Sequence, residues 1–299
     1  MVKVQHIEVL LAVENAGSIR AASKLLGKTQ PAVTKALRQA EAELGVAVFK
    51  RTASGVVLTE EGKIVLRRAR VIQSELRKLQ EDVDQRRGLG TGRLNVTVSP
   101  LAASRIVGAT IKRFKRKFPG VHVQINSGHE PIAFGPVREG QVDAVIGPEP
   151  REPDTAGLSV QFLVETDIVI VTGENSRWRN ATSLHELVSA EWLMIGTRAR
   201  LPILQRHFID RGLTPPDPMV TSESIVSVLS MLQDSDLLCT FPALLISQTT
   251  DKWRIRALDL VETLASARIS ITTSSERPPT PAIQYFCDCA MQVCQNEFI

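Results

Sequence analysis

Apolar residues recur with helical spacing through the first part of the chain and predict three short helices in succession. The first of them ends at Gly17. Ser18 is a good N-cap for the second helix, and Gly27 ends that helix after two turns. We expect the apolar face of the second helix to consist of Ile19, Ala22, Leu25 and Leu26.

The third helix begins after Thr29, and Pro31 is tolerated in its first turn because the early amides have no intrahelical partner. We expect the inward face of this helix to consist of Ala32, Val33, Ala36, Leu37 and Ala40. Its polar and basic residues, which should then face outward, are Gln30, Thr34, Lys35 and Arg38. Two short helices joined by a tight glycine-containing turn are typical of a helix-turn-helix.

Two short β-prone runs, residues 46–51 and 56–58, follow around a Ser-Gly turn and predict a hairpin that forms a wing.

Gln30 is suited to bonding a base edge, and Lys35 and Arg38 can reach guanine or phosphate. Arg51, at the base of the hairpin, is placed to touch the phosphate backbone. The alternative is an ordinary alanine-rich helical pair with a solvated polar face.

A long helix with a narrow apolar seam comes next, beginning after Thr59. Spacings of four and three residues along it make a two-position heptad pattern, whose natural partner is a second such helix. The alternative, a helix packed on its own domain, usually shows a wider apolar stripe. We therefore expect dimerisation through Val65, Ala69, Ile72, Leu76, Leu79 and Val83.

From Arg93 onward, strands alternate with amphipathic helices, and the first series of them predicts a parallel α/β sheet. Expected strands cover 94–98, 121–125 and 142–147, with one helix over 101–118 and another around 132–139. A second series has strands at 168–171, 192–195, 219–221 and 237–240, with helices at 201–211, 224–232 and 243–247. A strand at 268–272 and a helix at 281–293 close the chain.

Charge is distributed unevenly along the chain. Residues 1–87 hold 16 lysines and arginines against 10 acidic residues, whereas the other 212 residues hold 20 against 22. A basic N-terminal third on a nearly neutral body is expected when one end of a protein meets a polyanion. No apolar run approaches the ~20 residues of a spanning helix and no secretory signal is evident, so we expect a cytoplasmic protein without a membrane partner.

The four cysteines, Cys239, Cys287, Cys289 and Cys294, lack the paired spacing of a zinc site, and we expect neither a metal nor a cofactor. Packing in the core is the interpretation that we favour for them, and a redox or metal role for Cys287 and Cys289 is the alternative.

Taken in order, the landmarks of the first third resemble the N-terminal domain of LysR-type transcriptional regulators. They are Gly17-Ser18, Arg20-Ala21-Ala22, Leu25-Leu26, Gln30-Pro31-Ala32-Val33, Glu43-Leu44-Gly45, Phe49-Lys50-Arg51 and Leu58-Thr59-Glu60-Glu61-Gly62. The match covers residues 5–63, and many residues at fixed spacings are far more specific than one short motif. Thr29 and Thr34 stand where the family often has serine, which keeps the hydroxyl.

The resemblance implies that the recognition helix brings Thr29, Gln30, Pro31, Thr34 and Lys35 to the DNA. It also implies that Arg51 of the wing contacts the backbone or the minor groove, with Arg20 as a weaker candidate.

The remainder is similar to the family's effector domain, which resembles a periplasmic binding protein with two α/β lobes joined by two crossing strands, here 161–166 and 265–270. The expected fold is therefore an α+β multidomain protein. Its parts are a winged helix-turn-helix at 1–58, a linker helix at 59–88, a hinge at 89–92, a first lobe at 93–162 with 268–299, and a second lobe at 163–267.

An effector would bind beyond the carboxyl ends of the strands, between the lobes. Ser99 and Thr197 are the best candidates for holding a carboxylate, with simple helix capping as the alternative. Leu101, Pro148 and Phe241 are candidates for the apolar wall, and His129 for the rim unless it is only a solvated loop residue. The full set expected at this site is Ser99, Pro100, Leu101, Ala102, Gly128, His129, Gly147, Pro148, Thr197 and Phe241.

An enzyme is the main rival, but no nucleophile elbow, phosphate loop, dinucleotide fingerprint or metalloprotease motif occurs. An architectural DNA binder does not need a 200-residue α/β body. We therefore expect a non-enzymatic transcriptional regulator that binds double-stranded promoter DNA and is modulated by a small effector such as an organic acid. RNA polymerase is a further expected partner, and the oligomer is a homodimer or a dimer of dimers.

Overall fold

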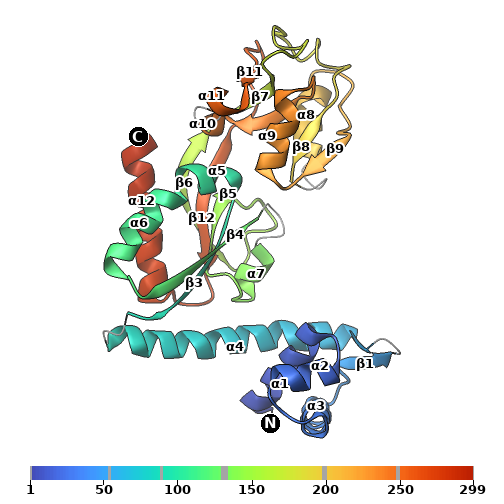
Figure 1. Ribbon diagram of the computed structural model, residues 1–299, viewed down its shortest axis with the longest axis vertical. Coiled ribbons are helices and arrows are strands. Elements are labelled where there is room, and N and C mark those ends of the chain that lie inside the picture. Colours follow the sequence, from blue (N-terminus) through green and yellow to red (C-terminus); the bar gives the residue numbers. More distant parts are fainter. Residues whose placement is uncertain are drawn as a thin grey trace. The chain divides into compact units, whose positions relative to one another are not determined.

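The computed structural model describes residues 2–52, 55–87, 90–128, 134–196, 201–246 and 250–298 (Figure 1). The chain divides into two compact units, Met1–Leu89 with Arg138–Gln141, and Gly90–Val137 with Val142–Ile299. Among the described residues, no helix is long and apolar enough to cross a membrane.

Three helices form the body of the first unit, α1 (Val4–Ala16), α2 (Ile19–Leu25) and α3 (Gln30–Leu44). Gly17 ends α1 in the left-handed conformation, at φ 68°. The hydroxyls of Ser18 and Thr29 cap α2 and α3 by accepting bonds from the amides of Ala21 and Ala32. The three helices and both caps predicted from the sequence are confirmed.

Two residues expected on the inner faces of these helices lie outside instead. Leu25 is 66% exposed and Ala32 is also exposed, while Ala22 and Val33 are fully buried. Each helical residue turns the side chain by about 100°, so Ala32 points well away from Val33. Both predictions were wrong because the contact face of each short helix is narrower than its apolar pattern.

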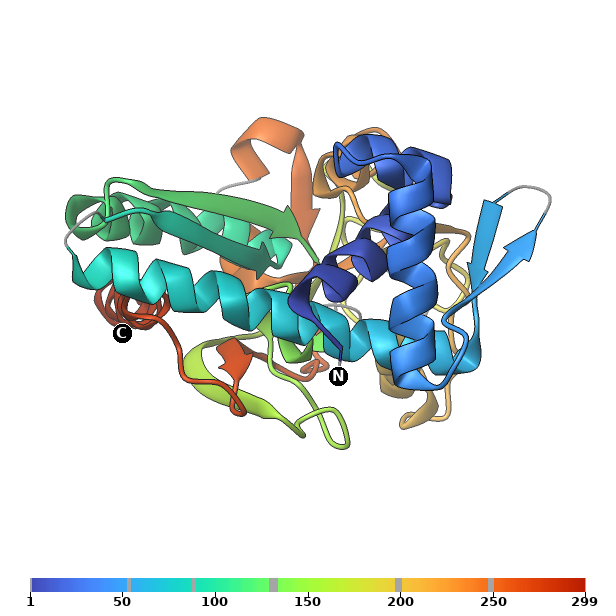
Figure 2. The ribbon, with the colours of Figure 1, turned by 90° about the horizontal axis from the view of Figure 1, so that it is seen from below.

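The wing is an antiparallel hairpin of β1 (Phe49–Thr52) and β2 (Gly55–Leu58), which Figure 2 shows projecting from the three-helix body. The amide of Val56 donates to the carbonyl of Gly17 at 3.1 Å, which ties the hairpin to the turn between α1 and α2. A Cβ at Gly55 would lie only 2.4 Å from that carbonyl oxygen, so the close approach requires glycine.

The long helix α4 spans Glu60–Arg86 and is capped by Thr59, whose hydroxyl accepts from the amide of Gly62 at 2.8 Å. Thr59 also donates to the carbonyl of Ala47 at 2.6 Å, so one buried hydroxyl joins the wing segment to the helix. The guanidinium of Arg70 bonds the carboxylate of Glu14, which connects α4 to α1.

The first lobe of the second unit is built on a five-stranded sheet with the order β4-β3-β5-β12-β6. Its strands are β3 (Gly92–Val98), β4 (Val121–Ser127), β5 (Ala144–Pro148), β6 (Leu158–Thr166) and β12 (Ala267–Ser274). Its helices are α5 (Pro100–Arg105), α6 (Val107–Lys117), α7 (Phe134–Arg138) and α12 (Pro281–Phe298). β3 pairs parallel with β4 and β5, as predicted, and β12 runs antiparallel to its neighbours.

The prediction of a single helix over 101–118 was wrong. The backbone breaks at Ile106, whose φ of −109° separates α5 from α6. Ile106 is completely buried, so the break lets one apolar side chain enter the core between two helices of different direction. Phe114 of α6 packs edge-on against Phe286 of α12, with ring centroids 5.8 Å apart.

The second lobe contains two small sheets, β10-β7-β11 and β8-β9. Its strands are β7 (Ile168–Gly173), β8 (Leu193–Ile195), β9 (Val220–Ser222), β10 (Cys239–Pro242) and β11 (Ile255–Ala257). Its helices are α8 (Leu201–Ile209), α9 (Ile225–Gln233), α10 (Ala243–Ile246) and α11 (Thr250–Trp253). The short elements α11 and β11 were not predicted, because four and three residues carry too little periodicity to be recognised.

Two neighbouring antiparallel strands, β6 and β12, lead the chain out of the first lobe and back into it (Figure 1). Their pairing contains a bulge. Val164 pairs with Ile269 and Phe162 with Ser270, so that Leu163 has no partner.

All four cysteines are buried and unpaired by disulfides. Burial raises the pKa of Cys287 and of Cys294 to about 12, and it also raises the pKa of Cys239. Burial likewise raises the pKa of Cys289.

Replacing Gly62 with alanine should destabilise the first unit by about 2 kcal/mol, because the new Cβ would lie 2.1 Å from the carbonyl oxygen of Val48. Hydrogen exchange of the amides around residues 48–62 measures the opening free energy directly. Gly108→Ala is the matched control, since its Cβ meets nothing within 4 Å, and it should be neutral or slightly stabilising. Unchanged protection in Gly62→Ala contradicts this packing.

The native thiols should resist a disulfide reagent such as DTNB at pH 8, because a thiol with a pKa of about 12 is ionised in roughly one molecule in ten thousand. Guanidinium should release all four for reaction. Asn180→Cys, at an exposed position, is the control that should react at once. Rapid labelling of a native thiol would show that a cysteine is available for redox chemistry.

Candidate functional site

The outward face of α3 gathers five of the residues predicted to contact DNA. Gln30, Lys35 and Arg38 are exposed and Thr34 is half-buried. Together with Pro31 they surround one shallow depression on the surface of the unit. Because Val33, Leu37 and Ala40 are buried beneath them, this polar face cannot turn inward.

Thr29 and Arg20 lie near the N-terminal ends of α3 and α2. Thr29 is exposed and caps α3, and the first turn of that helix contains no acidic residue. The free amides of a helix start favour a phosphate there, and no carboxylate opposes one. Arg20 is exposed on α2, where the backbone carbonyl of the same residue accepts a bond from Ser23.

The wing contains Arg51, whose backbone pairs with Val56, while its side chain lies outside the described part of the structure. A residue that sequence reasoning missed, Glu41, positions the wing. Its carboxylate accepts bonds from the amides of Val48 at 2.8 Å and of Phe49 at 3.2 Å, which joins α3 to the start of the hairpin. In the sequence Glu41 resembles any solvent-facing helical glutamate, so no signal could have identified it.

The seam predicted along α4 divides into two parts. Ala69 is only 3% exposed and belongs to the core of the first unit, against which Val65 also packs. Ile72, Leu76, Leu79 and Val83 remain exposed along the rest of the helix, with Leu79 at 63%. Four of the six residues therefore form an apolar stripe that is open to another molecule.

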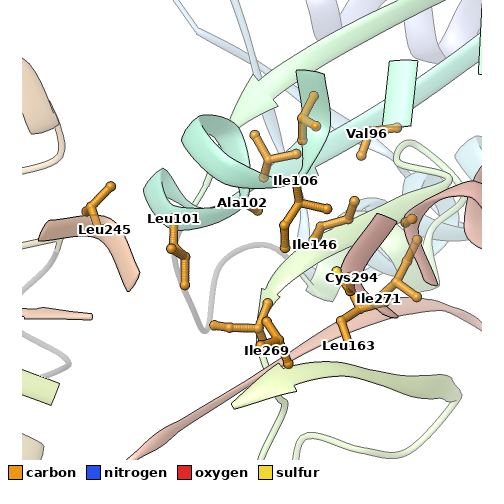
Figure 3. Packing of buried hydrophobic residues seen from close by; sticks show 14 of the residues in the cluster. Val96, Leu101, Ala102, Ile106, Ile146, Leu163, Leu245, Ile269, Ile271 and Cys294 are labelled. Carbon is orange, nitrogen blue, oxygen red and sulfur yellow. The ribbon is translucent and has the colours of Figure 1, made fainter. Parts of the chain in front are cut away.

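A pocket of about 350 Å³ lies between the two lobes of the second unit. Its first-lobe wall comes from the start of α5, the end of β5 and the beginning of β12. Its second-lobe wall comes from β7, β8, α8, β10 and α10. Figure 3 labels three of its apolar residues, Leu101 and Ile269 of the first lobe and Leu245 of the second.

Four of the residues predicted to hold an effector line this pocket, namely Ser99, Pro100, Leu101 and Pro148. The hydroxyl of Ser99 accepts from the amide of Ala102 at 3.3 Å, so the capping role that was the alternative is present. A Cβ at Gly147 would lie 3.4 Å from the Cβ of Ser99, which places this glycine directly behind the serine.

Other predicted effector residues are not pocket-lining. Ala102 and Phe241 are completely buried, and their side chains belong to the hydrophobic core. Gly128 donates its amide to the carbonyl of Val98 and does not line the pocket. His129 and Thr197 lie outside the described residues.

Sequence reasoning missed the ionisable groups of the pocket, which are Glu149, Arg151, His207 and Arg268. Glu149 and Arg268 form an ion pair, with 2.6 Å between Oε2 and Nε. Burial, and secondarily the charge of Arg211, lowers the pKa of His207. That shift favours a neutral imidazole in the pocket at pH 7. These four residues come from distant segments and share no motif, so only the folded chain brings them together.

No cluster of three or more histidine, cysteine or acidic side chains in the described part of the chain is arranged to hold a metal ion.

Two family models account for most of the sequence. Residues 4–63 match the bacterial regulatory helix-turn-helix protein of the lysR family, and residues 87–295 match the LysR substrate binding domain. Most of α4 lies between the two matches, since the first match ends near the start of this helix and the second begins directly after it.

Proteins of similar sequence are HTH-type transcriptional regulators. The HTH-type transcriptional regulator TdcA of Escherichia coli is 27% identical over 80% of this chain and 77% of its own. The HTH-type transcriptional regulator GalR of Pseudomonas putida is 25% identical over 98% of this chain and 74% of its own.

Solved structures share the fold over nearly the whole length. CbnR, a LysR family transcriptional regulator, superimposes with a TM-score of 0.69 at 20% identity, covering 98% of this chain and 99% of that one. Full-length CbnR in complex with its target DNA gives a TM-score of 0.67 at 20% identity, with 97% and 99% coverage. A full-length OxyR variant from Pseudomonas aeruginosa gives 0.70 at 17% identity, with 97% and 98% coverage.

The exposed basic helix, the wing and the two-lobed α/β domain with its central pocket thus occur in the order in which the two family models match. The chain belongs to the LysR-type family of transcriptional regulators, and it is a DNA-binding regulator with an effector-binding domain rather than an enzyme.

Proposed function

We propose that this regulator binds two-fold repeated promoter sites as a homo-oligomer joined through α4. We further propose that a small organic acid in the pocket between the lobes alters the promoter complex. The observation that carries the proposal is the outward face of α3, where Gln30, Lys35 and Arg38 surround one depression above a buried apolar stripe.

The DNA contacts follow from the shape and charge of the first unit. A helix with exposed amide and cationic side chains matches the donor and acceptor pattern of a major groove. The net balance of six positive charges over residues 1–87 (16 against 10) supports attraction to phosphate. Gln30 and Lys35 are assigned to base edges, and Thr29, Pro31, Thr34 and Arg38 to close approach and phosphate. Arg51 and Arg20 are assigned to the flanking backbone.

Dimerisation is supported by the exposed stripe of Ile72, Leu76, Leu79 and Val83 on α4. Four apolar side chains at spacings of four, three and four residues match the seam of a two-stranded coiled coil. Pairing two winged helices through this seam matches protein symmetry to repeated half-sites on DNA. Further pairing of effector domains would give a dimer of dimers.

The pocket supports a small organic ligand. Its walls are mostly apolar, with Ile168, Met194 and Leu204 among them, and a few polar groups converge on it, including Ser99. A volume of about 350 Å³ is in the range of sites for small molecules. The hydroxyl of Ser99 and the cationic side chains of Arg151 and Arg268 favour an acid.

The ligand acts by differential affinity. It shifts the regulator between two arrangements of its lobes or subunits only as far as it binds one of them more tightly. The two arrangements bend promoter DNA differently and so change the recruitment of RNA polymerase. Because its partner is promoter DNA, we place this bacterial-type regulator in the cytoplasm.

Lys35→Ala should weaken binding to DNA selected by the protein itself from genomic fragments by about tenfold, because a base-edge or phosphate contact is lost. Fluorescence anisotropy at several salt concentrations measures the change. Lys252→Ala, at an exposed position of the second lobe, is the control that should bind as the unaltered protein does. If all three proteins bind the DNA with equal affinity, the assignment of α3 as the recognition helix is wrong.

Leu79→Glu should split the α4 dimer, because each interface then buries two carboxylates against apolar neighbours. We expect the dimer dissociation constant to rise at least about a hundredfold, measured by sedimentation velocity. Leu25→Glu is a matched control, since Leu25 of α2 is 66% exposed and Leu79 is 63% exposed. If the Leu79→Glu protein still sediments as a dimer, the dimer contact lies elsewhere.

A further inference from the structure

The side chain of Arg268 is held at the pocket by two neighbours. Its Nε donates to Oε2 of Glu149 at 2.6 Å, and its guanidinium carbon lies 4.5 Å from the ring centroid of Phe162. Both Arg268 and Glu149 line the pocket. Ion pairing and stacking together fix a flat cation beside a space large enough for a ligand.

The bulge in β6 makes this arrangement possible. Without it Ser270 would face Leu163, whereas Phe162 now pairs with Ser270. Side chains at positions two apart along a strand share one face, so Phe162 lies on the same face of the sheet as Arg268. Phe162 is 46% exposed, and the guanidinium of Arg268 covers part of its ring.

Most hydrogen-bonding capacity of Arg268 is unused. A guanidinium has five N–H groups, and within the described residues only the one on Nε has an acceptor. The side chain is 52% exposed. Arg268 therefore has donors available to a ligand besides the one that Glu149 occupies.

The lining of the pocket contains more cationic than anionic side chains. Among the groups that line the pocket, Arg151 and Arg268 contribute two positive charges and Glu149 one negative charge. Glu165, which pairs opposite Arg268 on the neighbouring strand, adds a second carboxylate that acts on this guanidinium from outside the lining. Burial lowers the pKa of His207, which favours the neutral imidazole. The remaining walls are largely apolar, including Leu101, Met194 and Ile269.

We propose that Arg268 binds the anionic group of the effector, and that Glu149 is the internal carboxylate that this group displaces from the guanidinium. The inference rests on the proposed role of the pocket as the effector site. It narrows the effector class to organic acids with an apolar body. A neutral analogue could not displace Glu149.

Both partners of the exchange lie in the first lobe. Arg268 lies on β12, one of the two strands that connect the lobes, and Glu149 directly follows β5 of the first lobe. The backbone amide of Glu149 donates to the carbonyl of Arg268 at 2.9 Å, so the two residues are joined twice. A ligand that takes the guanidinium removes the side-chain bond and leaves the backbone bond.

Isothermal titration of the full chain with butanoate, hexanoate and phenylacetate, each beside its neutral primary amide, tests this proposal. At least one acid should bind, and its amide should bind at least about tenfold more weakly. Arg268→Gln should weaken binding of the acid at least about tenfold without changing that of the amide. Glu149→Gln should strengthen binding of the acid because the internal competitor is gone.

Arg179→Gln, at an exposed position of the second lobe, is the charge-matched control and should bind as the unaltered protein does. Ala267→Phe fills the pocket and separates the two claims. If it abolishes binding of the acid while Arg268→Gln does not, the pocket stands and the role of Arg268 is overturned. If Ala267→Phe leaves the affinity for the acids unchanged, the acids bind elsewhere and the pocket is not the effector site. Absence of binding by all three acids, or equal binding of acid and amide, overturns the role of Arg268 in recognising an anion.

Discussion

Burial of a narrow apolar stripe on α3 is the constraint on which the DNA-binding unit depends. Val33, Leu37 and Ala40 are removed from water against the neighbouring helices, and Ala40 is small enough to allow a close approach. A helix fixed along one face has no freedom to rotate, so Gln30 and Lys35 must face outward. The same helix carries Glu41, whose carboxylate binds the backbone before the wing. One packed helix therefore orients both surfaces that approach DNA.

The effector domain keeps a pocket between its two lobes, although buried apolar residues of both lobes belong to one continuous core. In the described part of the chain β6 and β12 make the connections between the lobes, and both belong to the sheet of the first lobe. Apolar residues from both lobes line the pocket, while Arg268 and Glu149 satisfy each other at its edge. An ion pair in a partly solvated site contributes little to stability. The pair is therefore suited to exchange with a ligand, because its loss does not unfold the domain.

Much of the fold was predictable from the sequence because helices, caps and strands are local. Ser18 and Thr29 cap the predicted helices. The two crossing strands that the family resemblance implied at 161–166 and 265–270 overlap β6 and β12, although β12 covers Ala267–Ser274. The errors share a physical cause, which is that packing decides what periodicity cannot. Ile106 interrupts a continuous helical pattern because the core takes its side chain, and Leu25 stays outside a contact that is too small to cover it.

The pocket was only half predictable for the same reason. Ser99 and Pro148 follow strands, where a general rule of α/β sheets places ligand contacts, and they do line the pocket. Arg268 and His207 have no such marker, since a bulge and a helix face bring them there from distant segments. The most direct test of the account is the salt dependence of binding to DNA that the protein selects. If each protomer of a dimer neutralises about three phosphates, the logarithm of the association constant should fall with the logarithm of salt concentration with a slope near −5. A slope near zero, or no binding even at low salt, would contradict the account.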